Sequence, residues 1–270
     1  ELRGTFYECT AVTKVTLPDT LRVIGEETFN YCSKLTDINI PEGVTAIGED
    51  AFHSCYSLQS VDMPDSVISI GLNAFRYCGE LRSVSFSNNL QTIQGGAFEG
   101  CDELTLVVLP DSVTYIGRYV FGECDSLQSV VLSKNLETIA YGAFWLCYSL
   151  ESIVIPDSVT TIGGVAFSNC KSLRSVSIGN GVKTIDSSAF SGCQSLRTIL
   201  IPESVQSMSV SSFAVSTVLL VYPDTYAHTF AKDNDLLYFE YDGETVPKVY
   251  SVNDVVYCII TVEAIAVDYI

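Results

Sequence analysis

One fixed interval of 23 residues, the step from Phe6 to Phe29, recurs through most of the chain and limits which folds the chain can adopt. A unit this short cannot bury its own apolar side, whereas stacked copies bury one continuous core. The repeat therefore predicts a solenoid. The residues that define it are Phe6, Phe29, Phe52, Phe75, Phe98, Phe121, Phe144, Phe167, Phe190 and Phe213, with Cys9, Cys32, Cys55, Cys78, Cys101, Cys124, Cys147, Cys170 and Cys193.

Each unit contains the pattern of a short strand. Leu35, Ile38 and Ile40 alternate with polar residues and stop at Pro41, which indicates a strand closed by a turn. Equivalent strands of successive units should form a parallel sheet. A second apolar pair follows the turn, and the later G-x-x-A-F-x-x-C segment has the spacing of one helical turn, so we predict short helical turns on the return limb.

The unit C-x-x-L-x-x-V-x-I-P-x-x-V-x-x-I-G-x-x-A-F resembles the BspA-like (Treponema pallidum type) leucine-rich repeat, over residues 1–213. The resemblance implies a leucine-rich-repeat solenoid: a right-handed β/α superhelix with its parallel sheet on the concave face. It also implies a secreted or cell-surface protein, typically bacterial or protozoan. Several members of that family are adhesins for host matrix proteins or other bacteria.

Three segments are expected along the chain. Residues 1–213 form the solenoid of about nine repeats, which we expect to be N-terminally truncated because the chain opens within a unit. Residues 214–245 are expected to be a C-terminal cap with one short helix, since a solenoid end must be covered. Residues 246–270 are rich in Val, Ile and Tyr and form either additional cap strands or the start of another module.

Charge and hydropathy disfavour two classes of partner. The chain has 32 acidic and 14 basic residues, a net charge of −18, which repels the phosphates of nucleic acid and anionic lipid headgroups. No apolar run approaches the roughly 18 residues that a membrane helix needs, so this chain is not expected to insert into a membrane. Its start shows no signal-peptide pattern.

The cysteines recur at one position of the repeat, and we call such a recurring position a column. The cysteine column suggests disulfides or a metal site, but its geometry favours a buried ladder of thiols. Thiols on adjacent coils project in the same direction, which fits the disulfide dihedral poorly. No C-x-x-C or Cys-His pairing supplies a zinc site, whereas free Cys packs well as a small buried hydrophobe. Cys258 lies outside the ladder, and both an exposed site and a strand core fit it.

Catalytic chemistry has little support in the sequence. The two histidines, His53 and His228, have no nucleophile motif near them and are expected at the surface. We therefore predict no enzyme, no catalytic residue, no metal site and no cofactor. Acidic residues around Asp233, Asp235 and Asp242 lack the spacing of an EF-hand loop, although weak calcium binding remains an alternative.

Two groups of residues are candidate partner-binding sites. Leu106, Val108, Val131 and Val154 occupy outward columns of the strands and should form an exposed apolar stripe, although Val also simply favours strands. Aromatic residues occupy outward columns of the return limb on the opposite face, where drift between repeats would also explain them. They are Tyr115, Tyr119, Tyr141, Trp145 and Tyr148.

The main functional hypothesis is a non-enzymatic, adhesin-like module outside the cell or on its surface. Its partner would be a protein, either a host matrix protein or a bacterial surface protein, bound by the strand face of the middle repeats. A carbohydrate-binding module that uses the aromatic residues to bind glycans is the first alternative. A structural spacer for a missing domain is the second.

Overall fold

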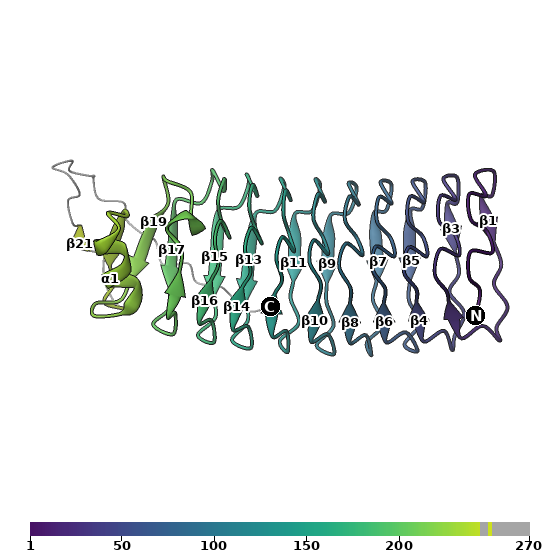
Figure 1. The fold of residues 1–270 in the computed structure, drawn as a ribbon, viewed down its shortest axis with the longest axis horizontal. Coiled ribbons are helices and arrows are strands. Elements are labelled where there is room, and N and C mark those ends of the chain that lie inside the picture. Colours follow the sequence, from purple (N-terminus) through teal and green to yellow (C-terminus); the bar gives the residue numbers. More distant parts are fainter. Residues whose placement is uncertain (244–247, 250–270) are drawn as a thin grey trace.

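The computed structural model describes residues 1–243 and 248–249 as a stack of coils along one long axis, which Figure 1 shows from β1 at one end to β19 and α1 at the other. This parallel-strand solenoid confirms the predicted repeat architecture. The expectations for residues 246–270 and Cys258 lie outside the described residues, except for Lys248 and Val249 in β21.

Each coil contributes one strand to each of two faces. The first strand of each coil belongs to the strand face: β1 Lys14–Val15, β3 Asp37–Ile38, β5 Ser60–Asp62, β7 Ser83–Ser85, β9 Leu106–Val108, β11 Ser129–Val131, β13 Ser152–Ile155, β15 Ser175–Ile178 and β17 Thr198–Ile201. The second strand follows the turn: β2 Val23–Ile24, β4 Ala46–Ile47, β6 Ser69–Ile70, β8 Thr92–Ile93, β10 Tyr115–Ile116, β12 Thr138–Ile139, β14 Thr161–Ile162, β16 Thr184–Ile185 and β18 Ser207–Met208.

Paired strands of successive coils run parallel and in register, so that a strand residue lies beside its counterpart in the next repeat. The pairing is interrupted between β3 and β5, β7 and β9, and β15 and β17 on one face, and between β10 and β12 on the other. Val131 of β11 pairs with Val108 of β9, and Ile139 of β12 pairs with Ile162 of β14. Because every coil repeats the same inward columns, identical side chains stack on one another in the core. The phenylalanine rings show this most clearly: their centroids lie 5.0 Å apart for Phe52 and Phe75 and 6.0 Å apart for Phe190 and Phe213.

The predicted helical turns of the return limb are not confirmed, because this limb consists of tight turns. Two of its columns have left-handed backbone in every coil from Gly4 to Gly192, for example at Asp50 (φ 52°) and Ser54 (φ 58°), and left-handed residues four positions apart interrupt an α-helix. The backbone amides of this limb donate hydrogen bonds alternately to carbonyls of the same coil and to carbonyls of the next coil. Phe52 N donates to Ala74 O at 2.7 Å, whereas His53 N donates to Asp50 O at 3.1 Å.

The C-terminal end carries different elements. The 3₁₀-helix η1 (Val210–Ser212) is followed by β19 (Val218–Val221), α1 (Tyr226–Asp233), β20 (Tyr238–Glu240) and β21 (Lys248–Val249). Helix α1 begins after Thr225, whose hydroxyl accepts from His228 N, and it packs against β19 and β20 through a face that includes Ala227 and Ala231. The assignment of residues 214–245 as a cap stays a prediction.

The predicted burial of the cysteine ladder is confirmed for eight of its thiols, those from Cys32 to Cys193. Each donates a hydrogen bond to the carbonyl of a phenylalanine of the preceding coil, for example Cys124 Sγ to Phe98 O at 3.2 Å. Burial raises the pKa of these thiols, to about 11 for Cys32 and about 12 for Cys193. Cys9, in the first coil, is partly exposed.

This difference predicts how the thiols react. In a Cys258→Ala background, iodoacetamide at pH 8 should modify only Cys9 of the native protein. The other thiols are shielded, and their raised pKa keeps them protonated at a pH where an ordinary thiol begins to ionise. Mass spectrometry after labelling in urea should show all nine remaining thiols modified. Rapid modification of Cys101 or Cys124 in the native protein would contradict the buried ladder.

Candidate functional site

The predicted apolar stripe lies on three adjacent strands of the strand face. Val108 on β9, Val131 on β11 and Val154 on β13 are each about half exposed, at 50%, 52% and 51%. Leu106, at 50%, begins β9 beside this row, and its register partner on β11 is Ser129. Since neighbouring strands are about 4.8 Å apart, these side chains form a continuous strip bordered by small hydroxyl groups.

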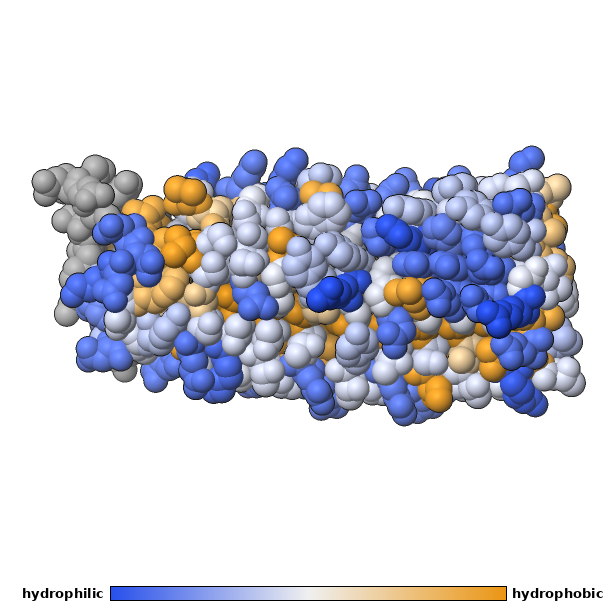
Figure 2. Space-filling model, viewed as in Figure 1, coloured by the Kyte–Doolittle hydropathy of each residue, from blue (hydrophilic) through white to orange (hydrophobic). Residues whose placement is uncertain are grey.

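Elsewhere, the exposed surface contains both apolar and polar residues. Figure 2 shows an interrupted apolar band along the long axis of one face, with polar residues on both sides. Such a band is what the repeat predicts, because residues in one outward column lie in a line along the solenoid. The polarity of the surface therefore changes from coil to coil within a column. Where several successive coils have apolar residues in one column, these residues form an apolar patch.

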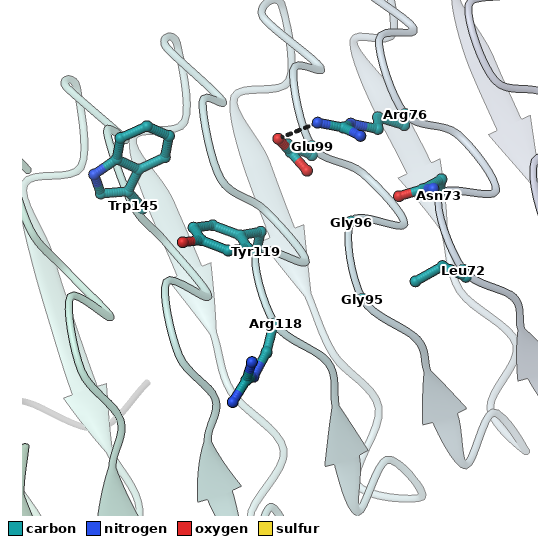
Figure 3. A pocket seen from close by; sticks show the side chains of 9 residues that line it. All are labelled: Leu72, Asn73, Arg76, Gly95, Gly96, Glu99, Arg118, Tyr119 and Trp145. Carbon is teal, nitrogen blue, oxygen red and sulfur yellow. Dashed lines mark hydrogen bonds and ion pairs between the residues drawn. The ribbon is translucent and has the colours of Figure 1, made fainter.

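A hollow of about 340 Å³ lies on the return limb, within the part of the chain that the structure describes (Figure 3). Glycines create it. Gly95 stands between Leu72 and Arg118 in one column, and Gly96 stands between Asn73 and Tyr119 in the next, so two neighbouring columns lack side chains at this point. The lining residues are Leu72, Asn73, Arg76, Gly95, Gly96, Glu99, Arg118, Tyr119 and Trp145.

One wall of the hollow is aromatic. Tyr119 contacts Trp145 edge to face at a centroid distance of 5.8 Å, and it contacts Tyr141 in the same way at 5.5 Å. Its ring lies over the backbone of Gly142, where an added Cβ would stand 2.5 Å from Tyr119 Cε1. Trp145 and Tyr119 are half-buried, so their rings are held in place while part of each remains open to solvent.

The opposite wall is polar. Arg76 donates from Nη2 to Glu99 Oε1 at 2.7 Å and to the Tyr77 hydroxyl at 3.1 Å. Burial raises the pKa of the Glu99 carboxyl, although the Arg76 guanidinium acts against this shift. Arg118 lies at the rim, with its guanidinium 5.6 Å from the centre of the Tyr141 ring.

The structure groups the predicted site residues into a stripe, a cluster and two outliers. The four stripe residues lie together, and so do Tyr119, Tyr141 and Trp145. Tyr115 lies on β10, in the sheet formed by the second strands. Tyr148 follows the buried Cys147, with the Lys171 ammonium 4.3 Å above its ring centre. Whether any of these residues binds a partner stays a prediction.

The polar half of the hollow was missed by sequence reasoning. Two signals were present: the Gly95–Gly96 dipeptide in columns where most other coils have side chains, and the opposite charges of Arg76 and Glu99 at the same position of adjacent repeats. Both histidines were expected at the surface, but both are half-buried. His53 Nδ1 lies 3.1 Å from Asn30 Oδ1, and His228 Nε2 lies 3.3 Å from Glu240 Oε1.

Comparison with known families agrees with the fold. The profile of six copies of the BspA type leucine rich repeat region matches residues 3–127 and 91–219, which together span more than half of the chain. This chain belongs to the BspA-type leucine-rich-repeat family. Families with this solenoid are generally non-enzymatic, and their repeats generally mediate protein interactions.

Solved structures of the same fold come from several bacteria. The T. pallidum leucine-rich-repeat protein is 32% identical, with a TM-score of 0.55 over 60% of this chain and 77% of that chain. A leucine-rich cell surface protein from Faecalibacterium prausnitzii is 29% identical, with a TM-score of 0.52 over 88% of this chain and 75% of that chain. The pneumococcal vaccine antigen PcpA, at 20% identity and a TM-score of 0.53 over 77% and 62%, shares the fold.

A comparison with curated proteins found no match. Within residues 1–243 and 248–249, no helix is long and apolar enough to cross a membrane.

The glycine floor of the hollow leads to a stability prediction. Gly96 has φ +62°, and an added Cβ would collide with Asn73 Oδ1 and stand 3.2 Å from Glu99 Oε2, so Gly96→Ala should lower the free energy of unfolding by about 1 kcal/mol or more. The matched control is Gly79→Ala, where the nearest atom is 4.0 Å away and φ is ordinary; it should leave stability unchanged or slightly raised. Equal urea midpoints for the two variants would contradict this geometry.

Proposed function

We propose that this chain is a non-catalytic, adhesin-like module at the bacterial cell surface, and that its strand face binds a protein partner. The observation that carries the proposal is the row of half-exposed valines, Val108, Val131 and Val154, on neighbouring strands. Contiguous exposed apolar area on a soluble protein usually marks an interaction site. Membership of the BspA-type family and the cell-surface description of the F. prausnitzii relative support the location.

The shape of the stripe favours a protein over a small molecule. The valines lie on a sheet, and the residues beside them, Ser129 and Ser152, are short and uncharged. Small ligands bind in concave sites that enclose most of their surface, whereas a protein partner can cover an extended strip. The absence of charged residues in these two columns of β11 and β13 lowers the cost of removing water from the strip.

The experiment compares binding by the native protein and by a Val108→Ser, Val131→Ser, Val154→Ser variant. Both are tested by surface plasmon resonance against purified host matrix proteins and bacterial surface proteins. Completing the burial of three half-exposed valines contributes about 2–4 kcal/mol, so the triple variant should bind its partner at least about 30-fold more weakly. The side chains point to solvent, and the Tm should change little.

The matched control removes three other exposed apolar side chains, through Ile68→Ser, Val210→Ser and Val215→Ser. This control should bind as the native protein does. Equal affinity of the two triple variants would exclude the strand face as the binding site. If none of the proteins binds, the spacer hypothesis replaces the interaction module.

A further inference from the structure

The hollow beside Trp145 brings together an aromatic wall, hydrogen-bonding groups and a cation without an ionic partner among the described residues. We propose that it binds an acidic saccharide, with the sugar ring against Trp145 and Tyr119 and the sugar carboxylate on Arg118. This site lies on the return limb and goes beyond the proposed protein-binding role of the strand face. Its volume, about 340 Å³, is at the lower end of the range for small-ligand sites.

The aromatic wall is preorganised. Tyr119 has the left-handed backbone (φ 54°) of its column, which holds glycine in both adjacent coils, at Gly96 and Gly142. The ring rests on Gly142 and contacts Trp145, so a ligand finds both aromatic surfaces already in place. Aromatic faces offer apolar contact to the C–H groups of a sugar ring.

The polar wall supplies hydrogen-bond acceptors. Glu99 Oε1 accepts from Arg76, whereas Oε2 lies over the floor above Gly96, next to Asn73 Oδ1. A hydroxyl group both donates and accepts, so adjacent sugar hydroxyls can donate to the oxygens of Glu99 and Asn73. A purely apolar ligand would leave these groups unsatisfied.

The charge of the hollow selects an acidic sugar. Arg118 has no acidic group within ion-pair distance among the residues that the structure describes, and the hollow holds two guanidinium groups and one carboxylate. This local positive excess occurs in a chain with a net charge of −18. The planar guanidinium fork matches the two oxygens of a carboxylate. Arg118 at the rim can therefore hold the acid group while Glu99 faces hydroxyls.

Trp145 is the single tryptophan of the chain and serves as a built-in reporter. The fluorescence of the protein is titrated with D-glucuronic acid and N-acetylneuraminic acid, and with glucose as the neutral counterpart. The same sugars are followed by saturation-transfer NMR, which also works for variants without Trp145. Both acidic sugars should give a saturable change in the millimolar range, with glucose at least about tenfold weaker.

Two variants separate stacking from charge recognition. Trp145→Ala should abolish binding of acidic and neutral sugars alike, whereas Arg118→Gln should remove only the preference for the acid. Tyr115→Ala, which removes an exposed tyrosine of β10 outside the hollow, is the matched control and should bind as the native protein does. The valine triple variant should also retain sugar binding, so failure of one proposal is distinguishable from failure of the other.

Three results would overturn the proposal. The first is no saturable response to either acid. The second is equal affinity for glucose and glucuronic acid, which would remove the role of Arg118. Glucose 6-sulfate is added to the same titration, and the third result is tighter binding of this sugar than of both carboxylates, which would assign the hollow to sulfated sugars.

Discussion

Each coil of this solenoid satisfies its backbone and buries its apolar side only through its neighbours. The strands are short, and their hydrogen bonds run between coils, as do those of the alternate amides in the return limb. Between the faces, phenylalanine rings stack and buried thiols donate to carbonyls of the preceding coil. Because these contacts need the same residue at the same position in every coil, the repeat spacing is kept without a gap from Phe6 to Phe213.

This dependence on register explains which features the sequence predicts well. Inward columns are nearly constant, so the phenylalanine ladder, the buried cysteines and the strands were all predictable. Outward columns vary, yet an outward residue of a strand still lies beside its counterpart one repeat away. The apolar stripe of Val108, Val131 and Val154 could therefore be located from their positions alone, although its role as a binding site remains a proposal.

The features that sequence reasoning missed have two physical causes. The G-x-x-A-F-x-x-C spacing fits a helical turn, but left-handed residues four positions apart break it, and their column includes Tyr119 and Val165 as well as glycine. The residue types of Tyr119 and Val165 do not predict a positive φ. The hollow arises where Gly95 and Gly96 lack side chains beside Leu72, Arg118 and Tyr119, and only the relative placement of these residues in space turns the missing side chains into a site.

A protein partner is expected to bind outward columns of the middle coils and to leave the shared core untouched. Hydroxyl-radical footprinting tests this directly, because it measures the solvent accessibility of individual side chains. With a protein partner bound, Leu106, Val108, Val131 and Val154 should become protected, whereas Trp145 should keep its reactivity. Protection confined to Trp145 and the return limb, with the valine stripe still fully reactive, would contradict the proposed role of the strand face.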